Sequence, residues 1–152
     1  MTDRAETPGL HWVGWREWVA LPELGIPRLR AKVDTGARTS CLHTFDLEAY
    51  EHEGERRVAF SIHPSRRNLN RVIHCDAPLL DERVVTDSGG HREMRYVILT
   101  QMRMGPWCWP VEMTLTNRDT MRFRMLIGRT AMKERLLVDP SASFLAGKPR
   151  EE

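Results

Sequence analysis

The sequence has few cysteines and no long apolar run, and each shortage excludes a class of protein. Three cysteines, Cys41, Cys75 and Cys108, without a Cys-x-x-Cys pair argue against a disulfide framework or a four-cysteine zinc site. No apolar stretch approaches the roughly 20 residues of a membrane-spanning helix, and the N-terminus lacks a signal-peptide pattern. We therefore expect a cytoplasmic protein that has no membrane partner.

Lysine is also scarce, because 20 of the 23 basic residues are arginine. Set against 21 acidic residues, the net charge of +2 is too small for a dedicated nucleic-acid binder, so no nucleic-acid partner is expected. Two interpretations of the arginine excess stay open. One is a codon bias of the genome, and the other is a surface whose guanidinium groups bind carboxylates.

The length of 152 residues, with 41% hydrophobic and 29% charged residues, is typical of one soluble globular domain. We place this domain at residues 11–146. The polar ends, residues 1–10 and 147–152, are expected to be flexible.

Alternation of polar and apolar residues predicts a domain made mainly of strands. Residues 28–33 show it most clearly, because Leu29, Ala31 and Val33 alternate with charged side chains. Thr130 begins the best helix candidate, residues 130–135. Further strands are predicted at 12–20, 58–62, 71–74, 82–86, 94–100, 110–116, 121–127 and 136–138. The fold class is therefore mainly β with one short C-terminal helix.

The best candidate for a catalytic motif is Asp34-Thr35-Gly36, which directly follows the most clearly predicted strand. The glycine allows close backbone approach, and the threonine hydroxyl can lock the turn, so the carboxylate is held rigidly. Two carboxylates that share one proton can act as acid and base on a water and a peptide bond. A chain with one such aspartate can form this pair in a two-fold symmetric homodimer.

This motif resembles the active site of the retropepsins, the retroviral-type aspartic proteases. The family's second signature, two apolar residues followed by Gly-Arg, stands here as Leu126-Ile127-Gly128-Arg129 before the predicted helix. The chain is most similar to a bacterial group of retropepsin-like proteins labelled ATP-dependent zinc proteases. The similarity covers roughly His11 to Leu145, including Val13–Glu17, Asp34–His43 and Leu126–Leu145.

The resemblance implies a closed β-barrel of the acid-protease type and an obligate homodimer with Asp34 of each subunit in the catalytic dyad. Thr35 would interlock across the dimer axis, and Gly36 and Ala37 would line the cleft. Gly128 and Arg129 would brace the active-site loop. The turn Asp87-Ser88-Gly89-Gly90 would form the tip of a flap that closes over the substrate.

Some members of this group are encoded beside an ATP-grasp ligase that adds glutamates to a ribosomal protein. The resemblance thus suggests a glutamate-rich peptide as substrate and a functional link to such a ligase. No Gly-x-x-x-x-Gly-Lys loop is present, so any use of ATP is expected in a partner.

The chain departs from the retroviral pattern in two places. Arg38 stands where those proteins carry an acidic residue that pairs with the arginine of Gly-Arg, so Arg129 needs another carboxylate and the cleft becomes more basic. Residues 45–78 are longer than the retroviral core requires, and we interpret them as an inserted hairpin or lobe.

Alternative interpretations stay open beside the peptidase hypothesis. Asp87-Ser88-Gly89 repeats the motif pattern, but 53 residues after Asp34 is too close for a second lobe, so a hairpin turn is favoured. No His-Glu-x-x-His motif occurs and no metal or other cofactor is expected, although His43 with Cys41, or His74 with Cys75, could contribute to a metal site. The main alternative is a non-catalytic dimeric module that binds acidic peptides.

Overall fold

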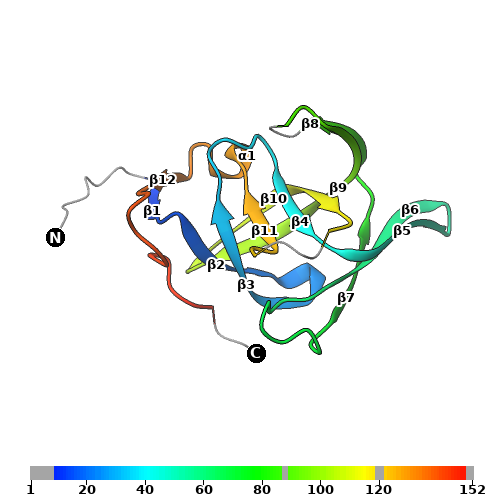
Figure 1. Cartoon of the computed structure of the whole chain (residues 1–152), viewed down its shortest axis with the longest axis horizontal. Coiled ribbons are helices and arrows are strands. Elements are labelled where there is room, and N and C mark those ends of the chain that lie inside the picture. The colour runs from blue at the N-terminus through cyan, green and yellow to red at the C-terminus, as the bar shows by residue number, and fades with distance from the viewer. Residues whose placement is uncertain (1–8, 87–88, 119–121, 150–152) are drawn as a thin grey trace.

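The computed structural model describes residues 9–86, 89–118 and 122–149 and confirms a mainly β protein. Within these residues the strands are β1 (His11–Val13), β2 (Arg16–Leu21), β3 (Ile26–Val33), β4 (Ser40–His43), β5 (Phe45–His52), β6 (Glu55–Ile62), β7 (Ile73–Pro78), β8 (Asp81–Thr86), β9 (Arg92–Met104), β10 (Trp107–Thr116), β11 (Met125–Ile127) and β12 (Leu136–Val138). A short 3-10 helix spans Pro22–Leu24, and the α-helix α1 spans Arg129–Met132 (Figure 1). No helix of the described residues is long and apolar enough to cross a membrane.

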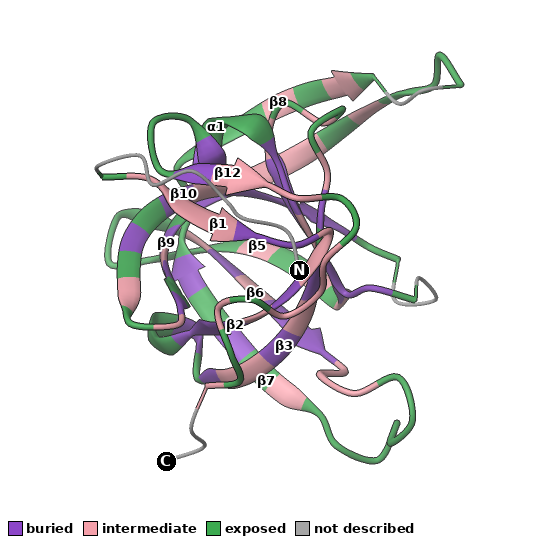
Figure 2. Ribbon diagram, turned by 90° about the vertical axis from the view of Figure 1, so that its left-hand side faces the viewer, coloured by how far each residue is buried: buried purple, intermediate pink, exposed green. Residues whose placement is uncertain are grey.

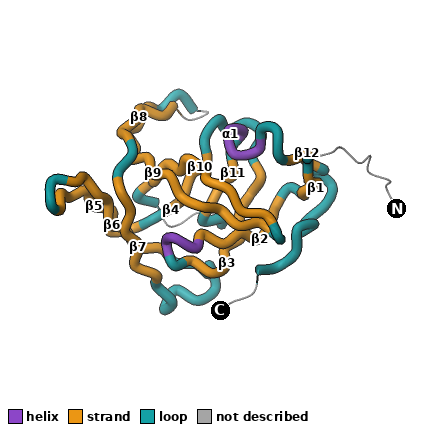
Figure 3. Tube along the Cα trace, turned by 180° about the vertical axis from the view of Figure 1, so that it is seen from behind, coloured by secondary structure: helices purple, strands orange, loops and turns teal. Residues whose placement is uncertain are grey.

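The strands form three sheets. The main sheet has the order β10-β4-β11-β3-β2-β9-β8, and β9 pairs with β10 as well as with β2. A three-stranded sheet, β5-β6-β7, extends from the body as a long hairpin with a third strand (Figure 1). The first and last strands, β1 and β12, pair in parallel (Figure 3).

The core is built mainly from strands of the main sheet, with further residues from β6 and β7 of the small sheet. Along β3, Leu29, Ala31 and Val33 are buried while the basic residues between them reach the outer face, as the alternation predicted. The largest fully buried side chains are Leu21, Ile26, Leu29, Leu42, Ile62, Ile98, Met102, Met104, Met113, Leu115, Met125 and Ile127. Figure 2 shows buried residues along the strands of the main sheet, whereas β8 is half-buried to exposed throughout.

Several expected boundaries were wrong. The helix covers Arg129–Met132 rather than 130–135, and β11 is confined to Met125–Ile127, with 119–121 outside the described residues. β4 and β5 were not predicted. All four residues of β4 are buried, so the period-two pattern of a one-sided strand is absent there.

The range 45–78 contains β5, β6 and β7, so it folds as a small sheet of its own. That it is an insertion into a retroviral-type core stays a prediction, as does the flexibility of both ends, because residues 1–8 and 150–152 lie outside the described residues.

Candidate active site

Asp34 lies at the end of β3, where three hydrogen bonds fix the start of a turn. Its backbone N–H donates to the carbonyl oxygen of Ile127 at 2.9 Å, and its own carbonyl accepts from Ala37 N–H at 3.2 Å. The carboxylate Oδ1 accepts from the N–H of Gly36 at 3.0 Å. The side chain is half-buried. The carboxylate is thus held in one orientation at the end of β3.

Glycine at position 36 leaves room for the carboxylate of Asp34. A Cβ built there would lie 3.2 Å from Asp34 Oδ1, in the path of the hydrogen bond that orients the carboxylate. Gly36 and Ala37 both line the cleft in front of Asp34. Thr35 is exposed and lies outside this cleft, on the face that it shares with α1.

The second motif braces this turn from β11 and α1. Gly128 is buried, and its N–H donates to Ser40 Oγ at 3.0 Å. Arg129 lines the cleft and donates from Nη1 to the carbonyl oxygen of Thr35 at 3.0 Å. The expected carboxylate partner is therefore replaced by a backbone carbonyl, which leaves the positive charge of Arg129 uncompensated by that contact.

A cleft of about 970 Å³ opens in front of Asp34. One wall is the active-site turn and the ends of β4 and β11, and the other is β8 with the facing parts of β9 and β10. Its lining is Asp34, Gly36, Ala37, Arg38, Thr39, Cys41, His43, Arg83, Val84, Val85, Thr86, Arg95, Glu112, Thr114, Leu126 and Arg129.

The predicted flap is an antiparallel hairpin, because β8 pairs with β9 from Asp81↔Val97 to Thr86↔Arg92. Gly89 and Gly90 lie exposed at its tip, and Gly90 has a φ of 84°, as a tight turn requires. Asp87 and Ser88 lie outside the described residues. The cleft is lined by the strand β8 rather than by the two described tip glycines.

The cleft contains four arginines and one carboxylate besides Asp34, and the motif analysis missed Arg83, Arg95 and Glu112 among them. Arg83 binds Glu112 with two hydrogen bonds, 3.0 and 3.1 Å long, which join β8 to β10. The hydrogen bonds from Arg83 lower the pKa of Glu112, so this carboxylate stays ionised and engaged. Arg83, Arg95 and Glu112 carry no motif, and only the pairing of β8, β9 and β10 brings them to the cleft.

His43 and Cys41 also line the cleft, but they do not form a metal site. His43 Nδ1 lies 2.8 Å from the hydroxyl of Thr116, and His74 Nδ1 lies 2.8 Å from the hydroxyl of Ser61. Burial, with repulsion from neighbouring arginines, lowers the pKa of His43 to about 4, and burial raises the pKa of Cys41. Among the residues that the structure covers, no three His, Cys, Asp or Glu side chains gather closely enough to hold a metal ion.

Comparison with known proteins decides the family. Residues 12–149 match the family described as RimB-like, retropepsin-like aspartic endopeptidase RimB. The chain belongs to this RimB-like family. The recognition made from Asp34-Thr35-Gly36 and Leu126–Arg129 is thereby confirmed.

Curated relatives of this RimB-like chain carry a different name. Proteins called probable alpha-L-glutamate ligase from Desulfotalea psychrophila, Shewanella halifaxensis and Parasynechococcus marenigrum are 41%, 43% and 44% identical over 140, 139 and 140 residues. These matches cover 91–92% of the chain but only 30% of each relative. The chain therefore spans about a third of the length of these ligases, and their name describes the longer protein.

A solved structure supports the fold of the RimB-like chain. A Legionella pneumophila protein of unknown function, Lpg0085, superposes with a TM-score of 0.73 at 24% identity. The match covers 89% of this chain and 97% of the other. It therefore extends over the main sheet and the small sheet alike.

Proposed function

We propose that this protein is an aspartic peptidase whose dyad is formed by Asp34 from two copies of the chain. The observation that carries the proposal is a single oriented carboxylate at a large cleft. Glu112, the other carboxylate in the lining, is already bound twice by Arg83, so it is a poor partner for sharing a proton. The exposure of Thr35 beside Asp34 supports a second copy as the source of the second carboxylate.

The two Asp34 carboxylates would act on one water molecule. The ionised carboxylate takes a proton from the water, whose oxygen attacks the peptide carbonyl carbon while the protonated carboxyl donates to the carbonyl oxygen. The tetrahedral intermediate then collapses, and the C–N bond breaks as the nitrogen receives a proton from the dyad. The Gly36 N–H keeps each carboxylate aligned throughout.

Closure of the cleft over a substrate would depend on the β8–β9 hairpin and on the main sheet that supports it. We interpret the main sheet as a closed barrel, because β9 pairs with β2 on one side and β10 on the other. The double hydrogen bond between Arg83 and Glu112 ties β8 to this barrel. The tip of the hairpin, where Gly89 and Gly90 lie, would then be the part that moves over the substrate.

The substrate that suits this cleft is an acidic, glutamate-rich peptide. Arg38, Arg95 and Arg129 line the cleft in addition to Arg83, and guanidinium groups bind carboxylates with directed hydrogen bonds. Arg83 is bound by Glu112 and Arg95 pairs with Glu93 at 3.3 Å, so Arg38 and Arg129 are the better candidates for substrate binding. The relatives named alpha-L-glutamate ligase support a substrate that contains glutamate. We therefore propose a cytoplasmic hydrolase that acts on glutamate tails and is functionally linked to an ATP-grasp ligase.

The test is the substitution Asp34→Asn, with Asp46→Asn as the matched control. Asp46 is exposed on β5, and its φ of 51° is one that asparagine tolerates. With a peptide of α-linked glutamates as substrate and mass spectrometry as readout, we expect Asp34→Asn to lower kcat about 10²–10⁴-fold. Asp46→Asn should retain the wild-type rate.

Two results would overturn the proposal. Undiminished hydrolysis by a folded Asp34→Asn protein would remove Asp34 from the chemistry. The alternative, a non-catalytic binding module, would be supported if the wild-type protein binds the peptide without hydrolysing it and the Asp34→Asn protein binds it with the same affinity. Sedimentation in the presence of the peptide tests the dyad, because a strict monomer cannot pair two Asp34 side chains.

A further inference from the structure

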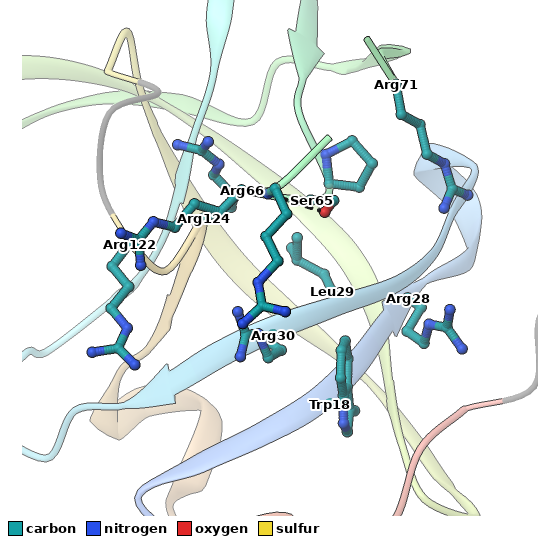
Figure 4. A pocket seen from close by; sticks show the side chains of 11 residues that line it. Trp18, Arg28, Leu29, Arg30, Ser65, Arg66, Arg71, Arg122 and Arg124 are labelled. Atoms are coloured by element: carbon teal, nitrogen blue, oxygen red, sulfur yellow. Dashed lines mark hydrogen bonds between the residues drawn. The ribbon is translucent and has the colours of Figure 1, made fainter. Parts of the chain in front are cut away.

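A second concave site lies on the outer face of the main sheet and is lined mostly by arginine (Figure 4). Its volume is about 320 Å³. Seven arginines line this site, which we call the arginine pocket. Arg28 and Arg30 come from β3, Arg66, Arg67 and Arg71 from the loop between β6 and β7, and Arg122 and Arg124 from the segment before β11. The described lining includes no aspartate or glutamate.

These arginines come from three parts of the chain that the sheet register brings together. Arg30 pairs with Trp18 across β2 and β3, and Ala31 pairs with Met125 across β3 and β11. Arg124, which precedes Met125, therefore lies level with Arg30. The loop after β6 covers the same face, because Arg124 Nε donates to the carbonyl oxygen of His63 at 3.2 Å.

The concentration of positive charge is unfavourable without an anion. Burial, together with repulsion from Arg16, Arg67, Arg122 and Arg66, lowers the pKa of Arg30. None of the described carboxylates forms an ion pair with Arg30, Arg66 or Arg122. An anionic ligand would relieve this repulsion and bind through charge-assisted hydrogen bonds.

The arginine pocket is adjacent to the cleft on the same sheet. Leu126 lines the cleft and Arg124 lines the arginine pocket, and these residues are two positions apart in the chain. Along β3, Arg30 precedes Asp34 by four residues, or about 13 Å of extended chain. A peptide strand of about four residues can therefore reach from one site to the other.

The spacing within β3 also matches an extended acidic peptide. Arg28 and Arg30 are two residues apart on one face of β3, so their Cα atoms repeat at about 6.6 Å. Alternate glutamates of an extended peptide repeat at the same interval. Successive same-face carboxylates can therefore meet successive guanidinium groups.

We propose that the arginine pocket is a docking site for the uncleaved part of a carboxylate-rich peptide whose scissile bond lies in the cleft. This inference rests on the proposed peptidase function and adds a second, distinct binding site to it. Each carboxylate docked there holds the substrate in register along β3. Longer acidic peptides should thus bind more tightly than short ones.

A peptide fits this site better than a single-stranded nucleic acid. Bases bind to open aromatic faces, and Trp18 is the aromatic residue in the lining. Its ring is stacked against Phe144 with centroids 5.7 Å apart, and Arg28 and Lys148 lie 5.6 and 5.1 Å from its centroid. The Trp18 ring thus already packs against Phe144 and nearby cationic side chains, whereas the guanidinium groups of the arginine pocket can bind carboxylates.

The experiment measures binding of fluorescein-labelled octaglutamate to the full chain carrying Asp34→Asn, by anisotropy at low salt. The test variant adds Arg66→Gln with Arg122→Gln, both exposed residues whose loss leaves the core intact. The control adds Arg103→Gln with Arg135→Gln, exposed arginines outside the cleft and the arginine pocket that change the net charge equally. We expect the test pair to weaken binding at least tenfold and the control pair less than twofold.

The outcomes separate this inference from the proposed function. If the test and control pairs lose equal affinity for octaglutamate, or if neither loses any, the docking site is overturned, even if the wild-type protein cleaves glutamate peptides. If only the test pair loses affinity and the wild-type protein cleaves no glutamate peptide, the docking site is supported and the proposed peptidase function is overturned. An oligouridylate that displaces octaglutamate from the same arginines at lower concentration would overturn the choice of a peptide as occupant.

Discussion

His43 is a histidine that the cleft wall keeps neutral. Its side chain is 6% exposed, its Nδ1 contacts the hydroxyl of Thr116, and Nε2 has no described hydrogen-bond partner. Burial and nearby arginines lower its pKa to about 4 in the folded protein, against the ordinary value of 6.5. The unfolded chain therefore binds a proton at pH values where the folded protein does not.

The consequence is an acid-sensitive contribution to stability. Between pH 6.5 and pH 4 the unfolded state takes up a proton at His43 and the folded state takes up less, so the free energy of unfolding decreases as the pH falls through this window. We expect His43→Asn to make the free energy of unfolding, measured by urea denaturation at pH 7, 5.5 and 4.5, less dependent on pH. His52→Gln, at a position whose side chain is 67% exposed, should change it little. Identical slopes for wild type and His43→Asn would contradict this expectation.

At the residue scale, the sequence predicted the carboxylate but not its surroundings. Asp34, Gly36 and Ala37 follow one another in the chain, so their proximity needed no tertiary information. Arg83, Arg95 and Glu112 reach the cleft only through the register of β8, β9 and β10. The pairing of Arg83 with Glu112 depends on residues 29 positions apart, a separation that no local pattern reveals.

At the element scale, the contact between β11–α1 and the active-site turn depends on one glycine. A Cβ at Gly128 would lie 2.5 Å from the backbone carbon of Thr39 and 2.7 Å from its oxygen. Backbone cannot move aside as a flexible side chain can. The next hydrogen bonds, from Arg129 N–H to Ala37 and from Thr130 N–H to Arg38, would be displaced with it.

We therefore expect Gly128→Ala to lower the free energy of unfolding by about 2–4 kcal/mol and to reduce activity in the protein that remains folded. Gly54→Ala is the control, because Gly54 has a φ of 80° but no atom within 4 Å of a built Cβ. Gly54→Ala should lower the free energy of unfolding by only about 1–2 kcal/mol, because alanine must adopt the left-handed conformation there. Urea denaturation with a parallel activity assay measures both. Equal effects would show that the close approach to Thr39 is unimportant.

The elements themselves were predicted unevenly. β3 carries one buried face, so alternation identified it, whereas the four buried residues of β4 have no exposed face to alternate with. β8 was also predicted, although its inner face is only half-buried. The position of the loop that carries Arg66, Arg67 and Arg71 could not be predicted, because nothing in its own sequence shows that it faces Arg30. The family resemblance supplied the predictions of a flap, a dyad and a barrel, which periodicity alone does not give.

At the scale of the whole molecule, Glu17 joins the two ends of the chain. Its side chain is fully buried and accepts hydrogen bonds from the N–H groups of Gly14, Leu145 and Ala146 at 2.7, 2.9 and 3.0 Å. A carboxylate with three donors satisfies backbone groups of two distant segments at once. The C-terminal segment is thereby fastened along β2.

We expect Glu17→Gln to lower the free energy of unfolding by about 2–3 kcal/mol, because the amide has one acceptor oxygen and places an NH₂ group against backbone donors. Limited proteolysis should also cut after residue 138 sooner than in wild type. Glu48→Gln, at an exposed position of β5, is the control and should change stability by less than about 0.5 kcal/mol. Wild-type stability in Glu17→Gln would show that the three contacts are dispensable.

The pairing of β1 with β12 has a consequence for how the protein is made in the cell. β3 pairs with β11, and β1 pairs with β12, so these early strands lack their partners until the residues up to 138 have been synthesised and have left the ribosome. Pairing between segments so far apart in the sequence must wait for the closure of a long loop, which makes folding slow.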